Sequence, residues 1–92
     1  MELELTSINM SFELRGVSYS GEFTKIDRKN WSKIENGSQL LMKLKDGNDY
    51  FIELVSIDKY GISFNYVGNK KQYSYFHERR HISELFIFKS DK

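Results

Sequence analysis

The feature of this sequence that most limits its fold is an internal repeat. The segments FELRGVSYSGEFTKIDRK (12–29) and MKLKDGNDYFIELVSIDKY (42–60) align with one single-residue gap, opposite Asp46. Six of the 18 aligned pairs are identical: Leu14/Leu44, Gly16/Gly47, Tyr19/Tyr50, Glu22/Glu53, Ile26/Ile57 and Asp27/Asp58. Each copy places strand-forming residues on both sides of a glycine, which is typical of a β-hairpin. The repeat therefore predicts two similar hairpins, over residues 10–26 and 39–57.

The turn of the second copy sets the expected register. Asp46-Gly47 lies between two apolar runs and predicts a two-residue type I′ turn, which pairs Lys45 with Asn48. Pairing register decides which side chains share a face of a sheet. The expected core face carries Leu40, Met42, Leu44, Phe51, Val55 and Ile57. Because Leu41, Ile52 and Leu54 fall on the other face, we expect the far end of this hairpin to be covered on both sides.

The two copies diverge after their shared Ile-Asp. In the first copy Asp27 can cap a helix, Ile26 and Trp31 occupy the staple positions, and Gly37 can end the helix. We therefore expect one short helix near residues 27–36. The second copy is followed by three strand-like segments, ISFNYV (62–67), QYSYFH (72–77) and ELFIFK (84–89).

The whole chain is dominated by strand-forming residues. It contains 14 aromatic residues and no proline, a composition that suits half-buried pleated surfaces. Together with the N-terminal segment MELELTSI, the pattern amounts to seven to eight short strands and one helix. Short consecutive strands commonly close or curl, because closure protects their edges. We predict a single all-β domain over residues 1–92, a small antiparallel barrel or curled sandwich that contains the duplicated hairpin.

Charge and cysteine content narrow the function classes. The net charge is +1, and only residues 67–92 are basic, with six cationic against three acidic side chains. This positive charge is smaller than that of a dedicated nucleic-acid binder, although a local patch can still contact phosphates. The absence of cysteine excludes thiolate metal sites and favours a reducing cytoplasm. No run approaches the roughly 20 apolar residues that cross a bilayer, so no membrane partner is expected.

The stretch His77-Glu78-Arg79-Arg80-His81 matches the H-E-x-x-H pattern of zinc metallopeptidases. That chemistry requires the motif on a helix, where both histidines face one metal, together with a third protein ligand. Strand-like segments flank the motif, and the chain has no third histidine. We therefore predict that the protein is not an enzyme and has no catalytic residue, metal site or cofactor. A zinc metallopeptidase is the remote alternative.

Charged and aromatic residues alternate near the C-terminus. The candidate binding residues are Lys70, Lys71, Tyr73, Tyr75, His77, Arg79 and Arg80. Such residues can stack on bases and neutralise phosphates, but they also suit a solvated hairpin tip followed by ordinary strand tyrosines. The leading hypothesis is a non-enzymatic binding module with a rigid β surface that contacts nucleic acid or an acidic protein surface. The alternative is a protein–protein interaction, inhibitor or regulatory protein. A homo-oligomer is compatible with both hypotheses.

The second hairpin also carries a recognisable motif. Leu44, Asp46, Gly47, Tyr50, Leu54 and Asp58 follow a spacing by which residues 40–88 resemble the Sm-like family, which includes Hfq. The C-terminal HISELFIF is similar to the short closing strand of such barrels. Tyr75 and His77 match two positions of the Tyr-Lys-His of Hfq proteins, with Phe76 in place of the lysine. The resemblance implies a small barrel. The family's RNA-reading asparagine would fall at Ile62, so its RNA site is not carried over.

Overall fold

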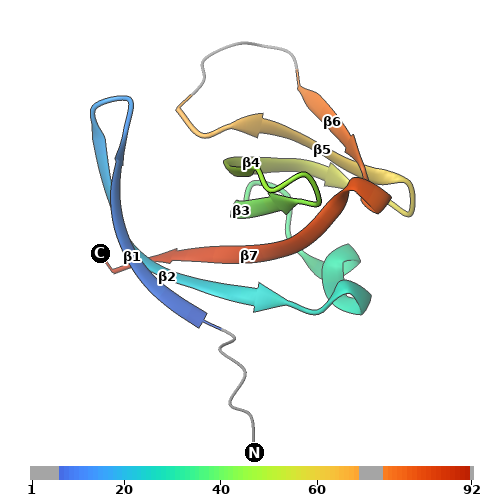
Figure 1. The fold of residues 1–92 in the computed structure, drawn as a ribbon, viewed down its shortest axis with the longest axis horizontal. Coiled ribbons are helices and arrows are strands. Elements are labelled where there is room, and N and C mark those ends of the chain that lie inside the picture. The colour runs from blue at the N-terminus through green and yellow to red at the C-terminus, as the bar shows by residue number, and fades with distance from the viewer. Residues whose placement is uncertain (1–6, 69–73, 92) are drawn as a thin grey trace, which may run out of the picture.

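The computed structural model describes residues 7–68 and 74–91, and within them seven antiparallel strands form one sheet (Figure 1). The strands are β1 (Ser7–Leu14), β2 (Val17–Ile26), β3 (Gln39–Leu44), β4 (Asp49–Ile57), β5 (Gly61–Tyr66), β6 (Tyr75–Glu78) and β7 (Ile82–Ser90). Two short 3-10 helices, η1 (Arg28–Lys33) and η2 (Arg79–His81), complete the described fold. The predicted all-β class and the lower predicted number of strands are confirmed. No helix in the described ranges is long and apolar enough to span a bilayer.

The sheet is open and curled. Its strand order is β1-β2-β7-β3-β4-β5-β6, so β1 and β6 form the two edges of the described sheet and do not pair with each other. The C-terminal strand β7 lies between the two repeated hairpins, and the β1–β2 hairpin projects at one side of the molecule (Figure 1). Of the two predicted architectures, a curled sandwich fits this arrangement and a closed barrel does not.

Each face of the curled sheet buries its own core. The first core is centred on β3, β4, β5 and β7 and contains Trp31, Ile34, Leu40, Met42, Leu44, Ile52, Leu54, Ile62, Phe64, Ile82 and Leu85. The second core is aromatic and contains Phe23, Phe86 and Phe88, with Phe12, Tyr19, Leu41 and Phe51 packed against them. The rings of Phe12 on β1 and Phe51 on β4 lie 5.2 Å apart, although three strands separate β1 from β4 in the sheet order. This contact shows how far the sheet curls.

The duplicated hairpin is confirmed residue by residue. In the first copy β1 pairs with β2, and Phe12 lies opposite Tyr19. In the second copy β3 pairs with β4, and Met42 lies opposite Tyr50. These two pairs occupy equivalent positions in the sequence alignment of the copies, so both hairpins have the same register relative to the repeat.

The predicted turn of the second hairpin is wrong by one residue. Lys43 pairs with Asp49, and the loop contains three residues, Lys45, Asp46 and Gly47, because the Leu44 N–H donates to the Asn48 carbonyl at 2.9 Å. Only Gly47 has a positive φ, of 94°, as in a type I turn followed by a glycine bulge. A two-residue type I′ loop occurs instead in the first copy.

The register error moves several side chains to the other face, because a one-residue slip inverts the whole strand. Ile52 and Leu54 join Leu40, Met42 and Leu44 in the first core. Phe51 packs in the second core, and Val55 is 41% exposed, so both were predicted wrongly. Ile57 reaches the first core as predicted, because a β-bulge between Leu54 and Ser56 inserts one residue into the strand.

The helix expected near residues 27–36 is shorter than predicted and is not an α-helix. It is the 3-10 helix η1, which ends at Lys33, and the Asp27 side chain makes no capping bond. The predicted contact between Ile26 and Trp31 exists in another form: the Trp31 indole N–H donates to the Ile26 carbonyl at 3.0 Å. Trp31 is almost completely buried, so tertiary packing rather than capping holds this segment.

Candidate functional site

The predicted C-terminal patch does not form one open surface. Lys70, Lys71 and Tyr73 lie outside the described residues. Tyr75 and His77 project from β6 toward the first core. The Tyr75 ring lies 4.8 Å from that of Tyr66, and the His77 ring stacks on Phe64 at 5.5 Å and an angle of 9°. Because neighbouring rings already cover them, these two side chains are poor platforms for stacking a base.

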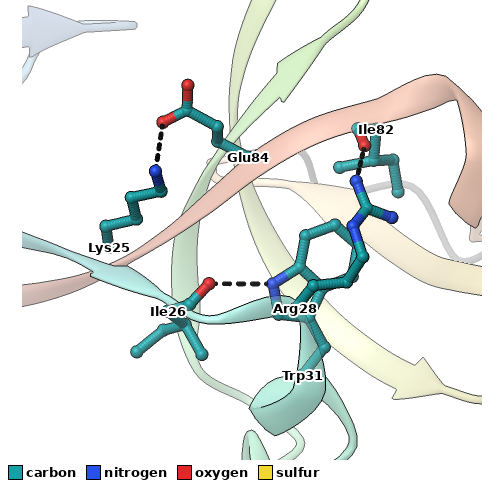
Figure 2. A network of polar contacts seen from close by, with 6 residues as sticks. All are labelled: Lys25, Ile26, Arg28, Trp31, Ile82 and Glu84. Carbon is teal, nitrogen blue, oxygen red and sulfur yellow. Dashed lines mark hydrogen bonds and ion pairs between the residues drawn. The ribbon is translucent and has the colours of Figure 1, made fainter.

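Arg79 has a structural role that the sequence did not reveal. Its guanidinium donates to the Arg28 carbonyl at 2.7 Å, and the Arg28 guanidinium donates to the Arg79 carbonyl at 3.4 Å. Arg28 also donates to the Ile82 carbonyl at 2.7 Å, as Figure 2 shows beside Trp31. Both guanidinium groups lie over the Trp31 ring, at 4.3 Å for Arg28 and 5.1 Å for Arg79. Arg79 therefore joins η2 to η1.

Arg80 alone among the four described patch residues is highly exposed, and its guanidinium forms an ion pair with Glu78. The side chains of this pair are 74% and 48% exposed, so water and salt screen their interaction. Arg80 is therefore exposed to solvent, whereas Arg79 packs against η1.

The H-E-x-x-H stretch does not lie on an α-helix. His77 belongs to β6, His81 ends η2, and Glu78 is occupied by its ion pair with Arg80. Both histidines line a pocket of about 420 Å³ together with Leu44, Lys45 and Asp46. Among the residues that the structure describes, no three histidine or carboxylate side chains are grouped to hold a metal ion. The geometry required for zinc peptidase chemistry is thus missing from this part of the chain.

A surface along β1 was not anticipated from the sequence. Side chains at its even positions, Ile8, Met10, Phe12 and Leu14, lie on the face of the second core, where Met10, Phe12 and Leu14 line a groove of about 240 Å³. Phe12 and Leu14 are half-buried, whereas Ile8 is 42% and Met10 41% exposed. We call these four side chains, together with the backbone edge of β1 that pairs with no other strand in residues 7–68 and 74–91, the β1 docking surface.

The first turn decides which backbone groups of β1 point away from β2. Leu14 and Val17 flank a two-residue loop and pair with each other, so they form the hydrogen-bonded pair that closes the hairpin. Hydrogen bonding alternates along an antiparallel pair, so the even residues of β1 bond to β2. The N–H and C=O groups of Ser7, Asn9, Ser11 and Glu13 therefore point away from the sheet.

A second hollow continues the groove beyond the tip of the hairpin. It has a volume of about 330 Å³ and shares Leu14, Asp49 and Phe51 with the first groove. Arg15, Tyr50, Tyr66 and Val67 complete its lining. Burial raises the pKa of the Tyr66 phenol above its ordinary value, with smaller contributions from Tyr50 and Tyr75. Tyr66 is therefore neutral at physiological pH, and the charged groups in this lining are Arg15 and Asp49.

One signal for the β1 docking surface was present in the sequence. The segment SINMSFEL alternates polar and apolar residues without a lysine or proline, and lysine and proline are common at exposed strand edges. Comparison with family models, with curated proteins and with solved structures finds no match to this chain.

Proposed function

We propose that the protein is a non-enzymatic binding module that docks an extended segment of a protein partner along β1. The observation that carries the proposal is that this edge strand is long, regularly paired and partly apolar. β1 is eight residues long, pairs with β2 in an unbroken register, and exposes about 40% of Ile8 and Met10 beside a groove. Proteins usually protect such an edge with lysine, proline, a bulge or a very short strand, and β1 has none of these features.

The mode of binding follows from the geometry of the edge. An extended segment can pair with the outward backbone groups of Asn9, Ser11 and Glu13 and so add an eighth strand to the sheet. Every second side chain of that segment would then face the same side as Met10 and Phe12. The expected partner therefore alternates apolar with polar residues, and its apolar residues extend the aromatic second core.

The proposal is tested with a short acetylated peptide of alternating valine and threonine that carries a lysine at each end. In a titration followed by amide NMR shifts, we expect the largest changes at Asn9, Ser11 and Glu13. Asn9→Pro should weaken binding about tenfold or more, because it removes an outward N–H without breaking a bond to β2. Asn9→Thr keeps that N–H and is the matched control.

Two outcomes would contradict this proposal. One is a set of peptide-induced shifts that lies away from β1, for example around Lys45 and His81. The other is an equal loss of affinity in Asn9→Pro and Asn9→Thr, since a side-chain effect would then replace the backbone effect. Circular dichroism of both variants checks that the sheet is retained.

A second candidate function is the binding of an anionic ligand such as single-stranded nucleic acid, favoured by the pocket around the two histidines. Lys45, His77 and His81 line this pocket with Asp46 as its only acidic residue in the described lining. Binding of single-stranded RNA should weaken steeply with added salt through counterion release. Lys45→Ala should reduce it, and Lys33→Ala, an exposed lysine on η1, is the control. Absence of binding at low salt would eliminate this candidate.

The Sm-like resemblance of residues 40–88 stays a proposal about architecture. Its support is that β7, the segment similar to the closing strand of those barrels, pairs with β3. No site residue is transferred through it. A cytoplasmic location also remains a proposal, supported by the absence of cysteine.

A further inference from the structure

We propose that the strand which docks on β1 is β1 of a second copy of this chain, in a two-fold antiparallel arrangement centred on Ser11. This inference rests on the proposed function, because it names the occupant of the same docking surface. Its basis is that β1 is complementary to itself in one particular register.

Symmetry restricts the registers that two copies can adopt. A two-fold axis perpendicular to the sheet relates antiparallel strands and keeps corresponding faces on the same side. Even residues must therefore lie opposite even residues, and odd opposite odd. The odd residues of β1 carry the outward backbone groups, so their pairing across the axis supplies the hydrogen bonds. The even residues then bring two apolar faces together as one continuous surface.

Two registers near the middle of β1 satisfy this rule: one places Ser11 on the two-fold axis, and the other places Met10 there. The contacts of the apolar residues distinguish them. With Ser11 on the axis, Ile8 lies opposite Leu14 of the second copy, and Met10 lies opposite Phe12 of the second copy. All four apolar side chains of the strand then meet apolar neighbours. With Met10 on the axis instead, Leu14 has no opposite residue within the strand. The first register therefore buries more apolar surface, including the exposed Ile8 and Met10.

Polar groups are compatible with the same register. Asn9 lies opposite Glu13 of the second copy, so a side-chain amide faces a carboxylate, and Ser11 faces its own counterpart. Glu13 is the single charged residue of β1, so no like charges meet directly. Pairing of Asn9, Ser11 and Glu13 across the axis forms about six backbone hydrogen bonds, two for each facing pair.

The other edge of the described sheet is a weaker candidate for self-association. β6 has only four residues, and η2 follows it directly. A short strand that ends in a helical turn offers few consecutive backbone groups to an incoming strand. The long and regular β1 is therefore the edge that offers a second copy the most backbone hydrogen-bond partners.

Single-cysteine cross-linking tests this register, because the chain contains no cysteine of its own. In the proposed dimer the two Cα atoms at position 11 are about 5.5 Å apart, within disulfide range. The two Cα atoms at position 9 are about 14 Å apart, because four residues separate them along the strands. Under mild oxidation, Ser11→Cys should therefore give a disulfide-linked dimer, and Asn9→Cys should not.

Sedimentation equilibrium of the parent protein, which contains no cysteine, complements the cross-linking. We expect a dimer that Asn9→Pro converts to a folded monomer and that excess alternating valine–threonine peptide dissociates. A monomer at all concentrations, or equal cross-linking at positions 9 and 11, would overturn the proposed dimer. If that monomer still binds the peptide at β1, the proposed function stands and only the second copy is excluded. If it does not bind the peptide, both fail.

Discussion

The guanidinium groups of Arg28 and Arg79 each donate a hydrogen bond to the other residue's backbone carbonyl, although both side chains carry a positive charge. Their repulsion is moderated by three carbonyl oxygens and by the Trp31 ring, which lies beneath both groups. The two residues are 51 positions apart, and their contact holds η2 and the start of β7 against η1.

We predict that Arg79→Ala lowers the free energy of unfolding by about 1 to 2 kcal/mol, because it removes a charge-assisted hydrogen bond and a cation–π contact. For a chain of this size the melting temperature should fall by roughly 5 to 10 °C. Arg79→Lys should not restore stability, since an ammonium group cannot reproduce the planar contact. Arg80→Ala is the control and should cost less than about 0.5 kcal/mol. Similar melting temperatures for the two alanine variants would refute the assigned role.

A second prediction concerns two buried glycines that lie under aromatic rings. A Cβ at Gly21 would overlap the Lys89 carbonyl oxygen and the Phe88 ring, and a Cβ at Gly61 would overlap the His77 carbonyl oxygen and the Phe76 ring. Because a backbone oxygen cannot rotate away, each substitution by alanine should destabilise the fold by about 3 kcal/mol. Urea denaturation measures this loss.

The matched control for both glycines is Gly16→Ala. Gly16 has a φ of 80° but no atom near the added carbon, so the cost is conformational, about 1 kcal/mol. If Gly21→Ala and Gly61→Ala cost no more than this control, the close packing of rings over these glycines would be disproved.

The repeat shows how far local sequence patterns can predict this fold. Both hairpins were predicted because each depends on a glycine and on neighbouring strand-forming residues. The register of the second was missed because Asp-Gly can form a two-residue loop or end a three-residue loop. The gap opposite Asp46 was the available signal: if Arg15-Gly16 is a two-residue loop, the second copy needs three loop residues to keep the same register.

The candidate site could not be predicted in the same way, because it depends on contacts between distant segments. β1 is an edge strand of the described sheet only because β7 pairs with β2 and β3, which lie 38 or more residues earlier in the chain. Likewise, nothing near Arg79 in the sequence indicates that Arg28 will bind it. Tyr75 and His77 lie on one face of β6, and packing against Phe64 and Tyr66, which are distant in sequence, decides that this face is covered.

A third prediction uses the strained turn of the first hairpin. Arg15 has a φ of 52° and is the only non-glycine residue with a positive φ in the described ranges. Asparagine tolerates this conformation better and is favoured before glycine in a type I′ turn. Arg15→Asn should therefore stabilise the protein by about 0.5 to 1 kcal/mol, measured by thermal unfolding. Lys45→Asn is the control: Lys45 has no positive φ, so an equal gain there would show that strain at position 15 is not the cause.

The last prediction follows from the raised pKa of Tyr66. Burial favours the neutral phenol, and the neighbouring Tyr50 and Tyr75 add to this effect. Well below pH 10 the phenol is neutral in both the folded and the unfolded chain, so it contributes no pH dependence. As the pH rises past 10, the unfolded chain releases the Tyr66 proton first and is stabilised relative to the folded chain. The free energy of unfolding must therefore fall, until the pH exceeds the raised pKa.

Tyr66→Phe should remove part of this alkaline loss, because phenylalanine has no proton to release. Tyr60→Phe is the matched control, since Tyr60 is 68% exposed and lies outside the aromatic group around Tyr66. Urea denaturation at several pH values around and above 10 measures the slope of stability against pH for the parent and both variants. A shallower slope in Tyr66→Phe alone is the expected result. Equal slopes in all three proteins would mean that Tyr66 titrates alike in the folded and unfolded chains, contrary to its partly buried position beside Tyr50 and Tyr75.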